Sequence, residues 1–233
     1  MGLYLVTDYR DYYDHAFDTH GTPFHRLSKG GMGRREMFPY LESIGLKTPR
    51  YGIVAEVVPN LLSERDSDIK TLASGQPVDL VVYTDEQAHC GDGKVRVSGA
   101  DALRLYPDQF CSEHLTTSPS GAGLSLRYLQ VGSRKWWLQY WSSDDWRSNV
   151  GEGGVEVLRE EDPPGYHPKV HDPLFAVDFL PIASNLFAID FNIAPGLGPL
   201  RDILAPSEIV SLLGTAIERE RSADTSINER SCP

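Results

Sequence analysis

Apolar and polar residues alternate through residues 174–193, and this alternation predicts a β-hairpin. Two runs rich in Phe, Val and Ile flank residues 181–185, which we expect to form the turn. Successive side chains of a strand point to opposite faces of the sheet. One face carries Asp178, Asp190 and Asn192. The other face is predicted to be apolar and to collect Phe175, Val177, Phe179, Phe187, Ile189, Phe191 and Ile193.

The two carboxylates of this hairpin are expected to lie directly opposite each other, provided that the hairpin is centred near Ser184. Like charges in that position destabilise a strand pair unless a positive charge lies between them. Because Mg²⁺ binds one or two carboxylates and completes its shell with water and substrate oxygens, we interpret Asp178, Asp190 and Asn192 as metal ligands. The alternative is the solvated side of an amphipathic hairpin. Four apolar residues on the same face weigh against that alternative: Ala176, Leu180, Ala188 and Ala194.

A second strand pair is predicted over residues 126–141, with a Gly-Ser turn in its middle, and a polar, glycine-rich loop follows at residues 142–154. Arg127 lies in the first of these strands and Arg147 in the loop. A planar guanidinium binds carboxylate or phosphate oxygens through two hydrogen bonds, which suits both arginines to an anionic substrate. The alternative is a pair of surface arginines stacked on the neighbouring tryptophans.

Taken together, these segments resemble the ATP-grasp superfamily, and within it the glutamate ligases that modify ribosomal proteins. The resemblance extends over residues 110–219 and depends on the order and spacing of several short motifs. These motifs are Leu126-Arg127, Val131-Gly132, Trp146-Arg147-Ser148-Asn149, Gly153-Gly154, Val177-Asp178, Asp190-Phe191-Asn192 and Pro195-Gly196. The resemblance implies an α+β, ATP-grasp-like fold of reduced size, with antiparallel sheets and flanking helices.

The likeness continues upstream with one substitution. Residues 80–94 resemble a strand followed by the family's glycine loop, but Tyr83 stands where the family carries a phosphate-binding lysine. Lys94 is the nearby cation, and Glu113 takes the acidic position of the adenine-contacting hinge. Arg35 lies near the position at which related enzymes carry a basic residue beside the nucleotide. The resemblance therefore implies that these four residues contact ATP.

The function that this resemblance implies is ATP-dependent ligation of a carboxylate to an amine through an acyl phosphate, with Mg²⁺ as the metal. Arg127, Arg147 and Asn149 would hold the reacting groups, and the substrates would be small molecules or peptides. A second hypothesis is a non-catalytic, ATP-grasp-like protein that binds a nucleotide or a partner, which the Tyr83 substitution favours. A third is a metal-dependent hydrolase, which would need His15 or His20 to converge with Asp178.

Four segments are expected along the chain: a shortened N-terminal segment and helix at 1–50, a small nucleotide-binding lobe at 51–118, a metal-binding lobe at 119–219 and a flexible tail at 220–233. Within the second segment, the polar residues 59–77 are predicted to be mainly loop. The N-terminal segment is too short for an independent core. We therefore expect a second copy of the chain or a partner protein to complete the acceptor site.

Composition and charge argue against a nucleic-acid-binding protein and a membrane-spanning protein. The 233 residues carry a net charge of −11, which argues against direct nucleic-acid binding because such binding needs Lys and Arg to neutralise phosphates. No apolar run approaches membrane-spanning length, and residues 3–6 are too short for a signal peptide. The 3 cysteines lie far apart, which is typical of a reducing compartment, so a cytoplasmic protein is expected.

Overall fold

The structure is a computed structural model that describes residues 33–67, 78–86, 93–160, 170, 173–192 and 195–229. Two antiparallel sheets and four helices make up this part of the chain. The order of elements is α3 (Arg34–Ser43), β1 (Tyr51–Ile53), α4 (Val54–Ser67), β2 (Asp79–Tyr83), β3 (Lys94–Ser98), α5 (Gly99–Leu105), β4 (Phe110–Glu113), β5 (Leu124–Val131), β6 (Arg134–Ser142), β7 (Gly153–Arg159), β8 (Leu174–Ile182), β9 (Asn185–Asn192), the 3-10 turn η2 (Gly198–Leu200) and α6 (Pro206–Glu229).

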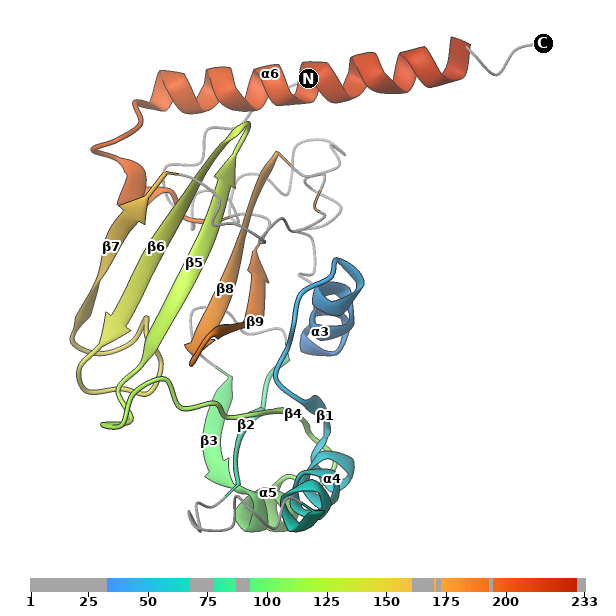
Figure 1. Ribbon diagram of the computed structural model, residues 1–233, viewed down its shortest axis with the longest axis vertical. Helices are drawn as coiled ribbons and strands as arrows, with labels where there is room; N and C mark the ends of the chain where they lie inside the picture. The colour runs from blue at the N-terminus through green and yellow to red at the C-terminus, as the bar shows by residue number, and fades with distance from the viewer. Residues whose placement is uncertain are drawn as a thin grey trace.

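The two sheets lie one after the other along the longest axis of the molecule (Figure 1). The small sheet has the strand order β1-β4-β2-β3, and α4 and α5 pack beside it at one end of the molecule. The large sheet has the order β7-β6-β5-β8-β9, and α6 runs across the ends of its strands. The predicted α+β class with antiparallel sheets and flanking helices is therefore confirmed.

The β8–β9 hairpin has a shorter turn than the sequence predicts, and a bulge compensates for the difference. Ile182 pairs with Asn185, so only Ala183 and Ser184 form the turn. The register then shifts by one residue between Phe179, which pairs with Ala188, and Asp178, which pairs with Asp190. A β-bulge of this kind places two residues opposite one and keeps both near the same face.

The bulge corrects part of the predicted face assignment. Ala188 packs in the apolar core with Phe179, whereas Phe187 pairs with Leu180 on the opposite face and Ile189 lines the pocket described below. The prediction for Phe187, Ile189 and Ala188 was wrong because strict alternation cannot anticipate an extra residue. Phe175, Val177, Phe179 and Phe191 lie in the core as predicted. Ile193 and Ala194 lie outside the described residues.

The large sheet buries both of its faces. One face contributes Tyr128, Trp137, Phe175 and Val177 to a core shared with α3 and the small sheet. The other face contributes a second set of apolar residues, which packs against η2 and α6: Leu129, Val131, Trp136, Leu138, Leu174 and Ala176. Strands β5 and β8 are consequently apolar on both faces over much of their length, and charged residues occur only where the sheet meets the pocket.

A helix replaces the first part of the loop predicted at residues 59–77. Helix α4 extends through Ser67, and the remainder of that range lies outside the described residues. Val54, Val57, Val58 and Leu61 recur at helical spacing, and all four are buried against the small sheet. Pro59 lies inside this helix, and the polar residues around it conceal the apolar spacing that precedes it.

Helix α3 joins the two sheets. Phe38 is completely buried and stacks on Tyr51 with ring centroids 5.0 Å apart. Two residues further on, Tyr40 meets Phe191 of β9 edge to face at 4.8 Å. Because α3 contacts both sheets, its first residues are held at the junction between them.

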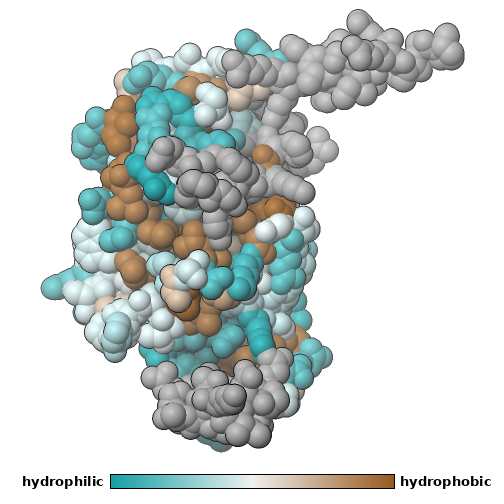
Figure 2. All heavy atoms as spheres, viewed as in Figure 1, coloured by the Kyte–Doolittle hydropathy of each residue, from teal (hydrophilic) through white to brown (hydrophobic). Residues whose placement is uncertain are grey.

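The surface of the described residues shows one apolar region along the large sheet. Figure 2 shows apolar side chains over the strands near the β7 edge, where Trp141, Val155 and Leu158 are exposed. In the described part of the chain, no helix is long and apolar enough to cross a membrane. The histidine-rich segment that the hydrolase hypothesis invokes lies outside the described residues.

Candidate active site

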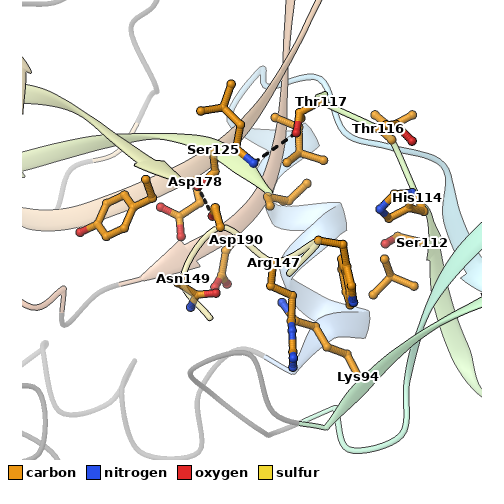
Figure 3. Close-up of a pocket in the computed structure, with 18 of the residues that line it drawn as sticks. Lys94, Ser112, His114, Thr116, Thr117, Ser125, Arg147, Asn149, Asp178 and Asp190 are labelled. Carbon is orange, nitrogen blue, oxygen red and sulfur yellow. Dashed lines mark hydrogen bonds between the residues drawn. The ribbon is translucent and has the colours of Figure 1, made fainter. Parts of the chain in front are cut away.

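A pocket of about 310 Å³ lies at the junction of the two sheets. Figure 3 shows its lining, with Asp178 and Asp190 from the large sheet, Lys94 and Ser112 from the small sheet, His114 directly after β4, and Arg147 from the loop after β6. Of the residues predicted to form the site, all but Arg35 line this pocket. They are Tyr83, Lys94, Glu113, Arg127, Arg147, Asn149, Asp178, Asp190 and Asn192.

A row of charged residues crosses three strands at the centre of the pocket. Asp178 on β8 pairs with Asp190 on β9, as the hairpin pattern predicted, and Arg127 on β5 pairs with Asp178 from the other side, which was not predicted. Arg127 donates two hydrogen bonds to Asp178, from Nε at 2.6 Å and from Nη2 at 2.8 Å. Both side chains are less than a fifth exposed. The pair therefore has the fork geometry in which an arginine best neutralises a carboxylate.

The second carboxylate is neutralised from the helix between the sheets. Arg34, the first residue of α3, donates a 2.7 Å hydrogen bond from Nη1 to Asp190. Burial raises the pKa of Asp190, but the charges of Arg34 and Lys94 outweigh that effect and hold it below its ordinary value. The opposed carboxylates thus have positive charge beside them, as predicted, and in this structure arginine side chains supply it.

The residues needed for a magnesium site are nevertheless together. Asp178, Asp190 and Asn192 line one pocket, and their carboxylate and amide oxygens are the hard ligands that Mg²⁺ prefers. Within the described residues there is no cluster of three or more His, Cys, Asp or Glu side chains, so an amide or substrate oxygen would have to complete the set. Two carboxylates and an amide suit a metal that keeps several ligands from water and substrate.

Two arginines begin α3, and the one that lines the pocket is Arg34 and not Arg35. Arg35 pairs with Glu86 at 2.7 Å, and its side chain is half exposed outside the pocket lining. Arg34 lies three and four residues before the buried Met37 and Phe38, so helical spacing turns it toward the interior. Its guanidinium stands over the Tyr83 ring, 5.4 Å from the centroid. Arg35, which the resemblance led us to expect beside the nucleotide, thus lies outside the pocket lining, whereas Arg34 lines the pocket.

Tyr83 closes the pocket on the side of the small sheet. Its ring is buried, and its hydroxyl lies 3.1 Å from the hydroxyl of Ser112 on the neighbouring strand. Burial raises the pKa of Tyr83, so the phenol is neutral at neutral pH. The β2 position that carries a lysine in the family that the sequence resembles is therefore a neutral aromatic residue in this chain.

The loop after β6 holds Arg147 in a fixed place. Asp145 accepts hydrogen bonds from Arg147 Nε at 2.9 Å and from Nη2 at 2.8 Å, and also from its backbone N–H. The loop packs closely on Gly123, where an added Cβ would lie 2.5 Å from the carbonyl carbon of Arg147. Ser148 bonds to Ser125 of β5 at 2.6 Å. These contacts aim the edge of the loop, including Asn149, into the pocket.

His114 is a pocket residue that the sequence interpretation missed. It follows Glu113, and its ring meets Trp146 edge to face at 5.6 Å. Its Nδ1 atom is buried without a hydrogen-bond partner among the described residues. Burial, reinforced by the charge of Arg96, lowers the pKa of His114 to about 4. The ring is thus neutral at pH 7 and has an unused polar atom, a signal that only the folded chain reveals.

Comparison with known proteins places the fold. No protein-family model matches the chain, and a search of curated proteins finds no significant match. Among solved structures, the chain resembles the ATP-grasp ligase PsnB complexed with its minimal precursor, at a TM-score of 0.51 and 14% identity over 82% of this chain and 62% of PsnB. It also resembles D-alanine–D-alanine ligase from Bacillus anthracis complexed with ATP, at a TM-score of 0.51 and 13% identity over 94% of this chain and 86% of that ligase.

These likenesses show an ATP-grasp-like α+β fold. The chain spans about three fifths of the length of PsnB. At identities of 13–14%, the likeness concerns the fold alone. The substrates have to be inferred from the residues of the pocket.

Proposed function

We propose that the protein is an ATP-dependent ligase that joins a carboxylate to an amine through an acyl phosphate. One observation carries this proposal: the pocket between the sheets brings two opposed carboxylates together with cationic side chains from four separate segments. The cations are Arg34, Lys94, Arg127 and Arg147. Phosphoryl transfer depends on this kind of positioning and charge neutralisation, and it needs no covalent enzyme intermediate.

The proposed site divides between the two sheets. Tyr83, Lys94 and Glu113 would contact the nucleotide from the small sheet, and Arg34 would contact its phosphates from the start of α3. Asp178, Asp190 and Asn192 would hold Mg²⁺, which supplies charge neutralisation at the phosphoryl group when bound. The solved complex of PsnB with ADP, Mg and a variant of its minimal precursor supports this assignment by similarity of fold.

The reaction would proceed in two steps. A carboxylate oxygen of the first substrate forms a bond to the γ-phosphorus of ATP while the bond to the ADP oxygen breaks. The amine nitrogen of the second substrate then attacks the acyl carbon, and inorganic phosphate leaves as the amine gives up a proton. Arg127 and Arg147 would hold the negative charge that develops on the transferring groups, and Asn149 would orient the acyl group.

A peptide is the substrate class that we test first. PsnB was solved with a minimal precursor, and the pocket of this chain opens between two sheets instead of being closed within one. The finer likeness to glutamate ligases of ribosomal proteins, based on the motifs around Arg147 and Asp190, makes glutamate the first amine to test. Neither substrate follows from the fold alone.

The experiment is a measurement of ADP release with Mg-ATP across a panel of amino acids, peptides and nucleotides, with mass spectrometry of the products. We expect ADP release that depends on both a carboxylate and an amine, together with a product heavier than the acid by the amine less one water. Nucleotide binding without turnover on any pair would instead favour the non-catalytic binding protein. The observation that favours the binding protein is the buried Tyr83 ring on β2, at a position where the resemblance implies a phosphate-binding lysine.

A further inference from the structure

The two opposed carboxylates of the pocket differ in how completely each is held by its arginine. Both oxygens of Asp178 accept hydrogen bonds from Arg127, and the Asp178 side chain is 17% exposed. Asp190 accepts one hydrogen bond from Arg34, through Oδ1, and its side chain is 37% exposed. With respect to the residues that the structure describes, Asp190 is therefore the carboxylate of the pair that keeps one oxygen available to a ligand in the pocket.

Arg34 has further contacts that do not involve Asp190. Its guanidinium carbon lies 5.4 Å from the centroid of the Tyr83 ring, within the range of a cation–π interaction. Its Nη1 also donates to Met37 Sδ at 3.1 Å, three residues further along α3. Because these contacts are independent of the carboxylate, the guanidinium can release Asp190 and still be stabilised. A cation at position 83 would instead repel Arg34, so a neutral ring suits this arrangement.

A divalent cation at Asp190 has to compete with Arg34. The arginine donates to Oδ1 of the carboxylate, and its positive charge repels a second cation at this distance. The apparent affinity of a site falls in proportion to the fraction of molecules in which the site is available. Pairing of Arg34 with Asp190 should therefore weaken the binding of a divalent cation to this carboxylate.

We infer that Arg34 is a displaceable counter-ion that sets the affinity of Asp190 for a divalent cation. This inference rests on the proposed function, because it uses the metal site assigned there, and it adds the residue that controls access to that site. When Arg34 is paired with Asp190, the two opposed carboxylates are both neutralised by arginines. When Arg34 keeps only its contacts with Tyr83 and Met37, Asp190 is left to the cation.

The test measures the binding of Mn²⁺ to the full chain without nucleotide, from the loss of the electron paramagnetic resonance signal of the free ion. Mn²⁺ takes the same hard oxygen ligands as Mg²⁺. Arg34→Gln removes the charge, and Arg34→Lys keeps it. Arg35→Gln is the matched control, because Arg35 is the next residue of α3 and pairs with Glu86 outside the pocket lining. Circular dichroism melts establish that each variant is folded.

We expect Arg34→Gln to bind Mn²⁺ about tenfold more tightly than the wild type, or more. Arg34→Lys should stay within about threefold of the wild type, and Arg35→Gln should match it. A folded Arg34→Gln protein that binds Mn²⁺ no more tightly than the wild type would overturn the inference. An equal gain in Arg35→Gln would also overturn it, since the effect would then come from net charge alone.

A second measurement needs only the wild type and the charge-conserving variant. Mg²⁺ should shift the NMR signal of Arg34 Nε–H, which its absence in Arg34→Lys identifies, and should leave the signal of Arg35 in place. An unmoved Arg34 signal at saturating Mg²⁺ would overturn the inference. Repeating the Mn²⁺ titration with ADP separates the two proposals: binding by the wild type with ADP, but none by Arg34→Gln without it, would overturn the inference alone. No Mn²⁺ binding by any variant, with or without ADP, would overturn the metal site of the proposed function as well.

Discussion

Arg34 donates a 2.7 Å hydrogen bond to Asp190 across 156 residues of sequence. The bond joins the first turn of α3 to the carboxylate row of the large sheet, and the Arg34 side chain is only 11% exposed. The helix that holds the two sheets together thus also supplies charge to the pocket between them. The same residue stands over Tyr83 of the small sheet, so one side chain contacts both sheets.

Replacement of Asp190 should separate metal binding from folding. Asp190→Asn keeps a side-chain acceptor for Arg34 and removes the charge, so we expect a folded protein whose ADP affinity no longer rises on addition of Mg²⁺. Asp190→Ala should show the same loss and also unfold more easily, by about 1–3 kcal/mol, because it leaves Arg34 without its partner. Calorimetry with and without Mg²⁺ and urea unfolding measure the two effects. Asp108→Ala, at an exposed site outside the pocket, is the control.

Removal of Arg147 should act on turnover more than on nucleotide binding. Its loop lies on the large sheet and Asp145 fixes its guanidinium, which suits it to positioning a reacting anion. We expect Arg147→Ala to lower product formation about 100-fold or more, with ATP affinity changed less than about threefold. Asn149→Ala should give a milder effect of the same kind. If product formation by Arg147→Ala equals that of the wild type, the arginine only stabilises the loop.

Gly132 should tolerate no side chain. It has a φ of +59°, and an added Cβ would lie 2.5 Å from the carbonyl oxygen of Leu212 on α6. Gly45 is the matched control, since its φ is +87° and an added Cβ there meets nothing within 4 Å. We expect Gly45→Ala to cost about 1–2 kcal/mol from backbone strain alone and Gly132→Ala to cost more. Equal losses in urea unfolding would show that α6 does not pack on this turn.

Cys111 should be inert in the folded protein. The thiol is completely buried on β4, and burial raises its pKa to about 12, so the reactive thiolate is scarce at neutral pH. Native protein treated with iodoacetamide should leave Cys111 unmodified, and unfolding in urea should expose it. Peptide mapping by mass spectrometry separates it from Cys90 and Cys232. Rapid modification of native Cys111 would show that the small sheet opens.

His114 should lower the free energy of unfolding as the pH falls. Its pKa in the folded protein is about 4, below the ordinary 6.5, so protonation is less favourable in the folded state than in the unfolded state. Its contribution to stability is therefore full above pH 6.5 and is lost as the pH drops from 6.5 to about 4. The difference in unfolding free energy between pH 7 and pH 5 should be smaller in His114→Gln than in the wild type. An unchanged difference would show that the ring titrates normally.

The hairpin that carries the carboxylates could be predicted from the sequence because its pattern is local. Alternation of Phe and Val with Asp defines two faces, and the pairing of Asp178 with Asp190 follows from the length of the turn. The pairing was correct, although the turn has two residues instead of the five expected and a bulge shifts the register by one before Asp178. The bulge could not be predicted from the sequence, because side-chain packing in the folded sheet determines where a bulge forms.

The inward orientation of Arg34 and the extent of helix α4 could both have been predicted from helical spacing in the sequence. Helical spacing already distinguishes Arg34 from Arg35, since Arg34 lies three and four residues before Met37 and Phe38, whereas Arg35 lies only two residues before Met37. In α4, the spacing of Val54, Val58 and Leu61 indicates a helix, but Pro59 and its polar neighbours favoured a loop. By contrast, the pairing of Arg127 with Asp178 depends on strand neighbours far apart in sequence, which no local pattern contains.

The bulge in β9 means that the distance between the turn and Asp190, counted in residues, sets which side of the sheet that carboxylate occupies. With the two-residue turn and no bulge, Asp178 would face Ile189, and Asp190 would pair with Val177 and point into the core. Loss of the one extra residue between the turn and Asp190 would therefore transfer a charge into the apolar interior. The chemistry of this pocket is therefore encoded partly as a count of residues, and evolution can alter it by deletion more abruptly than by substitution.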